Sequence, residues 1–213
     1  MSDNTPPGIF DFPSHYRTRL QMIDFVVNRL PDSVTRTVVL LGDSITEAHP
    51  ARELGGLRVI NQGISGDQAA HPEGGILRRI DRLAPARPAH VFLLVGINDL
   101  NDGKPVAKYL GEMRDLVREI KSSVTEAKLH LQSILPTRDA YAHLLKSVQE
   151  SNAGLQKIAR AEEVGFLDLF PTMADEDHAI REELTTDGVH LTNAAYDVWI
   201  QALEEYLAAR RQS

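Results

Sequence analysis

The residues that could carry out chemistry fall in four short segments of the sequence. Ser44 follows Gly-Asp in the first segment, Gly66 lies in the second, Asn98 in the third, and Asp187 and His190 share the fourth. Acyl transfer needs an activated hydroxyl, a base for its proton, a group that orients the base, and donors for the developing oxyanion. The segments supply all four, which predicts a serine-dependent hydrolase of acyl esters.

Ser44 is the predicted nucleophile, His190 is the general base, and Asp187, three residues earlier, fixes the tautomer of the imidazole. Three donors are predicted for the oxyanion hole. The backbone amide of Ser44 can point into the site from a strand-to-helix turn. Gly66 lacks a Cβ and lets a ligand approach its backbone amide. Asn98 would contribute its side-chain amide.

Each of these residues also has a structural interpretation. Ser44 can cap a helix that follows a strand, and Asn98 can be the N-cap of the next helix. Asp187 and His190 can be two metal ligands, although HExxH is absent and no other cluster has convincing ligand spacing. The occurrence of all four segments in one chain favours catalysis, and we predict no metal and no other cofactor.

The segments must be positioned by an ordered scaffold. Short apolar runs alternate with longer stretches of helical period, which predicts an α/β three-layer sandwich with a parallel sheet. The five predicted strands are Val38 to Leu41, Leu57 to Asn61, His90 to Val95, Leu129 to Ile134 and Val164 to Leu169. Polar residues follow the first three strands at their carboxyl ends, where open parallel sheets bind ligands. The fourth segment precedes the last helix, from where a loop can return to that edge.

Helices are predicted between and around the strands. Lys104 to Ser123 and Tyr141 to Glu163 each place apolar residues on one face. A leading helix capped by Ser14 precedes the first strand, and a closing helix carries Trp199 as a core residue. Residues 1–13, with three prolines, are predicted to form an extended arm. We find no repeat and no linker, so residues 1–213 are predicted to be a single domain.

Composition excludes several classes of function. The chain has 213 residues and no cysteine, which rules out a thiolate nucleophile, disulfides and a cysteine zinc site. Its net charge is -7 and its 23 Lys and Arg are scattered, which argues against a nucleic-acid partner. No basic leader and no run of about 18 apolar residues is present, so we expect no transmembrane segment and a cytoplasmic location. The expected partners are a small-molecule acyl ester and water, and the sequence leaves a homodimer open.

The four segments together resemble the SGNH hydrolases, also called GDSL-type lipases and esterases. They read GDSIT, NQGISGD, GIND and DGVHL, in the order of that family. The resemblance extends from about Thr37 to the C-terminus. The leading helix and the short chain are most similar to the platelet-activating-factor acetylhydrolase-like and carbohydrate acetylesterase branches.

This resemblance implies a flavodoxin-like sheet of five strands in the order 2-1-3-4-5, no cofactor, and the roles given above to Ser44, Gly66, Asn98, Asp187 and His190. Two departures affect the expected acyl pocket and leave the catalytic positions unchanged. Ala48 stands where the family often has glycine after Thr-Glu, and Gln68 begins a Gln-Ala-Ala run where Thr or Ser is common.

Other polar residues receive secondary expectations. His49 and His71 are expected near the edge of the substrate cleft. Arg138 is expected either to contact a polar substrate group or to form a surface salt bridge. The acidic stretch 175–183 is expected to be a solvated loop, with a substrate lid as the alternative.

Esters with short acyl groups, such as acetyl esters of sugars or other small alcohols, are the predicted substrates. A thioesterase or lysophospholipase acting on longer acyl chains is the alternative, because the four segments do not set acyl length. A non-catalytic carbohydrate- or protein-binding module on the same fold is the alternative from another class. All the proposed catalytic residues are present in the sequence, which favours an enzyme.

Overall fold

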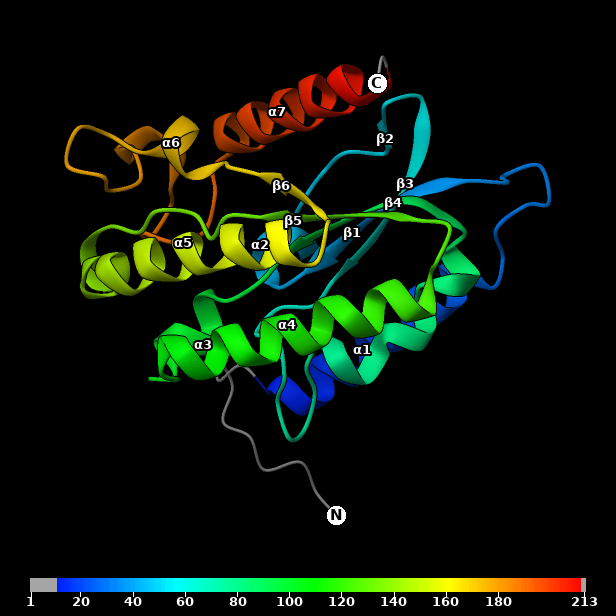
Figure 1. Ribbon diagram of the computed structural model, residues 1–213, viewed down its shortest axis with the longest axis horizontal. Helices are drawn as coiled ribbons and strands as arrows, with labels where there is room; N and C mark the ends of the chain where they lie inside the picture. Colours follow the sequence, from blue (N-terminus) through cyan, green and yellow to red (C-terminus); the bar gives the residue numbers. More distant parts are fainter. Residues whose placement is uncertain (1–10, 212–213) are drawn as a thin grey trace.

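A six-stranded sheet forms the centre of the computed structural model, which describes residues 11–211 (Figure 1). The strands lie in the order β2-β3-β1-β4-β5-β6. Their bounds are Thr37–Gly42 for β1, Glu53–Leu54 for β2, Leu57–Gly63 for β3, Pro88–Leu94 for β4, Lys128–Gln132 for β5 and Gly165–Leu167 for β6. Every pairing except that of β2 is parallel. The five predicted strands and their order are therefore confirmed.

The sixth strand corrects the prediction of five. Glu53 and Leu54 of β2 pair antiparallel with the start of β3. Gly55 and Gly56 connect the two strands with positive φ angles of 59° and 73°, the combination that a two-residue hairpin loop needs. A strand of two residues is too short to show an alternating pattern, so the Gly-Gly pair was the only available signal.

Helices cover both faces of the sheet (Figure 1). Helix α7 lies across one face, and α1 and α4 lie on the opposite side, where α4 also packs against α5. The helices are α1 (Phe12–Val27), α2 (Ser44–Glu47), α3 (Ile97–Asn101), α4 (Val106–Ser123), α5 (Leu145–Ala161), α6 (Phe170–Met173) and α7 (Asn193–Arg211). Four short 3₁₀ segments join them: Ile76–Arg82, Ala84–Ala86, Asp139–Leu144 and Glu182–Leu184. This is the predicted three-layer arrangement.

All six residues of β1 are buried, as expected for a strand covered by helices on both faces. Trp199 of α7 is fully buried, which confirms its assignment to the core, and its indole Nε1 donates to Gln132 Oε1 at 2.7 Å. The buried side chains form one cluster around the sheet. The carboxyl ends of the parallel strands therefore sit on a rigid base.

Helix boundaries differ from the prediction, most clearly at the starts of α1 and α5. The N-cap of α1 is Asp11, whose side chain accepts from the amide of Ser14 at 3.4 Å, so Ser14 is not the cap. The helix begins at Phe12, which shortens the predicted arm; residues 1–10 lie outside the described range. The segment predicted as a helix from Tyr141 opens with 3₁₀ turns, and α5 begins only at Leu145.

Within residues 11–211, no helix combines the length and the apolar character needed to cross a bilayer.

Candidate active site

Ser44 lies at the end of the central strand, on a sharp turn into a short helix. Strand β1 ends at Gly42, Asp43 is the N-cap, and Ser44 is the first residue of α2. The Asp43 side chain accepts from the amide of Ile45 at 3.0 Å. A Cβ on Gly42 would lie 2.1 Å from the main-chain oxygen of Leu94, so only glycine fits there. The local sequence thus fixes the serine at the carboxyl edge of the sheet.

The fourth segment returns to the same edge and reaches this serine. His190 Nε2 lies 3.1 Å from Ser44 Oγ, and His190 Nδ1 lies 2.7 Å from Asp187 Oδ2. The second oxygen of Asp187 accepts from the amides of His190 and Val189 at 2.8 and 3.0 Å. With the proton on Nδ1 facing the carboxylate, Nε2 is left to accept the serine proton.

The charge of Asp187 is stabilised by these contacts. Partial burial alone would raise the pKa of this carboxyl group, but the hydrogen bonds from the His190 ring and from two backbone amides outweigh it. Its pKa is therefore lowered, and the carboxylate is ionised at neutral pH. An ionised Asp187 orients the imidazole and can stabilise positive charge that develops on the ring during a proton transfer.

The turn that carries Asp187 and His190 is held by hydrogen bonds to Thr185 and by close packing against Arg138. Thr185 Oγ1 accepts from the amide of Gly188 at 2.9 Å and donates to the main-chain oxygen of His190 at 2.8 Å. Gly188 has a φ of 95°, and a Cβ there would lie 2.3 Å from the main-chain oxygen of Arg138. The acid and the base are therefore held by a turn with little freedom.

The predicted oxyanion donor Gly66 lies in the loop after β3, and the predicted donor Asn98 lies in the short helix α3 that follows β4. Gly66 has a φ of 80°, a conformation that favours glycine. Asn98 Nδ2 donates to the main-chain oxygen of Asp67 at 2.9 Å, so a hydrogen bond connects the Asn98 side chain to the residue after Gly66. Gly96 is the N-cap of α3 and Asn98 lies inside the helix, so the capping interpretation of Asn98 is wrong.

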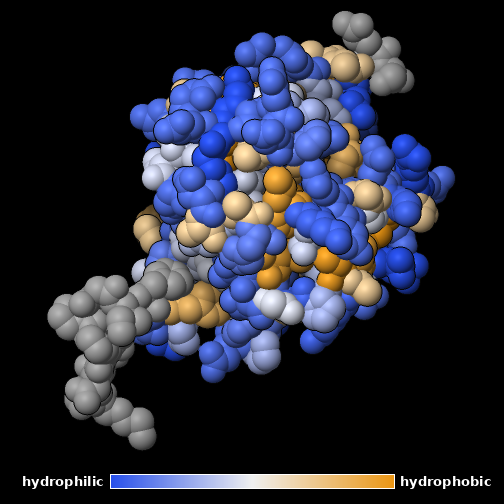
Figure 2. Space-filling model, turned by 90° about the vertical axis from the view of Figure 1, so that its left-hand side faces the viewer, coloured by the Kyte–Doolittle hydropathy of each residue, from blue (hydrophilic) through white to orange (hydrophobic). Residues whose placement is uncertain are grey.

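Apolar side chains gather in the middle of the face that carries the strand ends, within a hydrophilic surround (Figure 2). A narrow cavity of about 10 Å³ is lined by Ile45 and Val189, the sequence neighbours of Ser44 and His190. Its other lining residues are Leu94, Ile97, Ile134, Leu135, Pro136 and Thr137. This volume is about that of one water-sized sphere.

The structure locates three further residues for which a role was expected, His49, Arg138 and His71. His49 is buried, not at the cleft edge, and its ring packs edge-on against Trp199 with centroids 4.6 Å apart. Arg138 forms the salt bridge, with Asp175, and its Nε donates to the main-chain oxygen of Ile180 at 2.7 Å. Arg138 therefore links the acidic stretch 175–183 to the loop after β5. His71 lines a groove of about 330 Å³ formed with Gln68 and residues at the start of α4.

Two charged residues in the shell around the site were missed from the sequence. Glu47 accepts hydrogen bonds from Ser65 and lies within ion-pair distance of His15 and Arg19 of α1, and Arg79 is fully buried in an ion pair with Asp67. Their partners lie 12 to 37 residues away along the chain, and no local pattern marks such contacts. Among residues 11–211, no group of three or more His, Cys, Asp or Glu is placed to hold a metal ion.

Comparison with known proteins finds a family and several similar folds. The model of the GDSL-like lipase/acylhydrolase family matches residues 40–198. A Streptococcus pneumonia structure, provisionally assigned as a platelet activating factor, is 25% identical, with a TM-score of 0.77 over 92% of this chain and 94% of that one. A GDSL-like lipase from Bacteroides thetaiotaomicron is 21% identical, with a TM-score of 0.73 over 94% of this chain and all of its own. A provisionally assigned acylhydrolase from Bacteroides fragilis is 22% identical, with a TM-score of 0.75 over 95% and 99% of the two chains. No curated protein matches.

Proposed function

The chain belongs to the GDSL-like lipase/acylhydrolase family and is an ester hydrolase, and from this premise we propose that it cleaves esters through an acyl-enzyme on Ser44. The observation that carries the proposal is the line of contacts from Ser44 Oγ through the His190 ring to Asp187, at 3.1 and 2.7 Å. These are the distances at which a general base can take a proton.

The proposed reaction has two halves. Ser44 Oγ attacks the ester carbonyl while its proton passes to His190 Nε2, and the carbonyl oxygen becomes an oxyanion. Backbone amides of Ser44 and Gly66 and the side-chain amide of Asn98 stabilise that oxyanion. The imidazolium then gives its proton to the departing alcohol oxygen as the bond to the carbonyl carbon breaks. In the second half, water adds to the acyl-enzyme with His190 again as base, which releases the acid and restores Ser44.

Esters of short acyl groups are the proposed substrates, with acetyl esters of sugars or other small alcohols as the class. This choice follows the resemblance to the acetylhydrolase-like and acetylesterase branches, and the cavity of about 10 Å³ lined by Ile45 and Val189 offers no room for a long chain. The longer-chain alternatives, a thioesterase or lysophospholipase, need a much larger apolar tunnel.

A panel of p-nitrophenyl esters with acyl groups of two to twelve carbons, run beside acyl-CoA thioesters, tests this proposal. We expect kcat/KM to be highest for acetyl and to fall with each added carbon. Equal activity at all lengths, or a preference for long acyl-CoA, would contradict the short-acyl assignment. Ser44→Ala is the control for the chemistry and should lower turnover roughly 10⁴-fold or more. Failure of a fluorophosphonate probe to label folded wild-type protein would instead favour a non-catalytic binding module.

A further inference from the structure

Both neighbours of Gly66 in the sequence are held by charged side chains that also hold the nucleophile segment. On one side, Ser65 is bound by Glu47, which lies in the same one-turn helix as Ser44. On the other side, Asp67 is bound by Arg79, which also contacts Gly42 at the end of β1. Gly66 therefore lies between two links that both lead back to Ser44.

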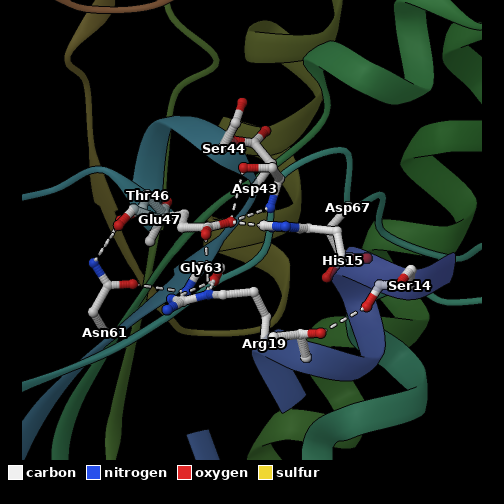
Figure 3. A network of polar contacts seen from close by, with 12 residues as sticks. Ser14, His15, Arg19, Asp43, Ser44, Thr46, Glu47, Asn61, Gly63 and Asp67 are labelled. Carbon is white, nitrogen blue, oxygen red and sulfur yellow. Dashed lines mark hydrogen bonds and ion pairs between the residues drawn. The ribbon is translucent and has the colours of Figure 1, made fainter. Parts of the chain in front are cut away.

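The link through Glu47 is built from several donors on one carboxylate. Its Oε2 accepts from the amide of Ser65 at 2.6 Å and from the hydroxyl of Ser65 at 2.8 Å. His15 Nε2 lies 2.9 Å from the same oxygen, and Arg19 Nε lies 3.1 Å from Oε1. Figure 3 shows the Glu47 carboxylate reaching toward His15 and Arg19. Partial burial would raise the pKa of Glu47, but the hydrogen bonds from His15 and Ser65 lower it, so the carboxylate is charged at neutral pH.

The link through Arg79 is fully buried. Its Nε and Nη2 atoms each lie 2.8 Å from Asp67 Oδ2. Nη1 donates to the main-chain oxygen of Gln62 at 2.7 Å, and Nη2 donates to that of Gly42 at 3.0 Å. One planar guanidinium thus joins the ends of β1 and β3 to the loop after Gly66. Through the main-chain oxygen of Asp67, which accepts from Asn98, the same link reaches a third proposed oxyanion donor.

A buried ion pair is a weak source of stability, because desolvation offsets most of the attraction between the charges. Its geometric effect is strong, because charge-assisted bonds with a rigid donor fork fix their acceptors in place. We propose that Glu47 and Arg79 are positioning residues that together fix the amide of Gly66 relative to Ser44 and so set the geometry of the oxyanion hole. This inference rests on the proposed function.

The leading helix takes part in the same arrangement. His15 and Arg19 are one helical turn apart on α1, and Arg19 also donates to the main-chain oxygen of Gly63 at 2.9 Å. These residues lie outside the matched segment 40–198. Helix α1 is therefore expected to tune catalysis without contributing an atom to the reacting centre.

Glu47→Gln and Arg79→Lys test the proposal, separately and together. Arg79→Lys keeps the buried positive charge but loses the fork, and Glu47→Gln keeps the shape but loses the negative charge. The matched controls are Glu73→Gln, exposed on the same loop as Gly66, and Arg82→Lys, whose ion pairs with Asp24 and Asp81 lie outside the site. For each variant, kcat and KM for p-nitrophenyl acetate are measured beside the melting temperature and the inhibition constant of phenylboronic acid. Its boron adds to Ser44 Oγ, and the resulting tetrahedral boronate places one of its oxygens in the oxyanion hole.

We expect kcat to fall about 10- to 100-fold in each single variant. The affinity for phenylboronic acid should fall in parallel. KM should stay within about twofold of the wild-type value, and the acid side of the pH profile of kcat should not move. The double variant should lose less than the product of the single effects, because both act on one amide. The controls should behave as wild type.

Two results would overturn the inference. A lower melting temperature with unchanged kcat and boronate affinity would make the links merely structural, and a rise in KM alone would make them substrate contacts. If Arg79→Lys does not fold, Asp67→Asn removes the same ion pair with nearly unchanged shape. Near-normal turnover in Ser44→Ala would refute the proposed function itself, whereas a loss of roughly 10⁴-fold in Ser44→Ala beside normal Glu47→Gln and Arg79→Lys would refute only this inference.

Discussion

Asn98 offers a side-chain amide with two N–H groups, of which one donates to the main-chain oxygen of Asp67 at 2.9 Å. The bonded hydrogen fixes the orientation of the amide, and in the proposed mechanism the other hydrogen is donated to the oxyanion. A donor that is held in place before the reaction needs no reorganisation as negative charge develops on the substrate.

Asn98→Ala should therefore lower kcat about 10²- to 10³-fold with a small change in KM, because the lost bond forms fully only in the transition state. Steady-state kinetics on p-nitrophenyl acetate provide the measurement. Asn101→Ala, at the exposed end of the same short helix, is the control. A variant that lost only substrate affinity would show that the Asn98 amide binds the ground state.

At this scale the sequence predicts the reacting groups better than it predicts their supports. Ser44, Asp187 and His190 stand in short segments of distinctive composition, and the structure brings all three into contact. Arg79 lies in Ile-Leu-Arg-Arg-Ile, where nothing separates it from its exposed neighbour Arg78. Its role depends on contacts with residues brought close only by the fold.

Among the elements, the turn before α7 leaves no room for a side chain at Gly188. Gly188 has a φ of 95°, and a Cβ would lie 2.3 Å from a backbone oxygen that cannot move aside cheaply. Gly188→Ala should displace the turn that carries Asp187 and His190, and we expect kcat to fall at least about 10-fold.

The matched control is Gly111→Ala, in the middle of α4, where a Cβ would meet nothing within 4 Å. Because alanine is the better helix former, this variant should gain about 0.5–1 kcal/mol of unfolding free energy without loss of activity. Urea denaturation and steady-state kinetics on both proteins make the comparison. Normal turnover in Gly188→Ala would mean that the triad does not depend on this turn.

Elements with a strong repeating pattern were predictable, and their ends were not. The parallel strands stand out because they are nearly continuous apolar runs, as in Val38 to Leu41. The start of α1 was misplaced because Asp11 and Ser14 are both good caps, and only the backbone decides between them. The 3₁₀ opening before Leu145 shares its spacing with a helix, so the pattern alone cannot separate the two.

For the molecule as a whole, buried ionisable groups determine how stability changes with pH. Burial lowers the pKa of His130 to about 3 and that of His49 to about 4. Each therefore stabilises the fold above pH 6.5, and that contribution is lost as the pH falls toward the lowered value, because the unfolded chain binds the proton more readily. Burial raises the pKa of Asp43 to about 7 and of Asp99 to about 6. These two carboxyl groups act in the opposite sense, so the wild-type profile should be shallow between pH 4 and 7.

A difference measurement isolates one histidine. His130 lies 3.0 Å from a ring nitrogen of His90 and 3.2 Å from the Tyr206 hydroxyl, and glutamine can replace it as donor and acceptor without titrating. The stability lost in His130→Gln should be about 2 kcal/mol larger at pH 7 than at pH 5, as measured by urea denaturation. His143→Gln, at an exposed histidine, is the control. A penalty of equal size at both pH values would mean that folding does not lower the pKa of His130.

The two sides of the reacting centre differ in how closely they are enclosed. The cavity lined by Ile45 and Val189 has a volume of only about 10 Å³, whereas the His190 and Asp187 side chains are 49% and 46% exposed. We therefore expect the enzyme to discriminate between acyl groups by their size. The alcohol part of the ester would extend into solvent and be discriminated little. We expect such an enzyme to remove one small acyl group from many different alcohols. Its cellular role would then depend on which of these esters are present with it.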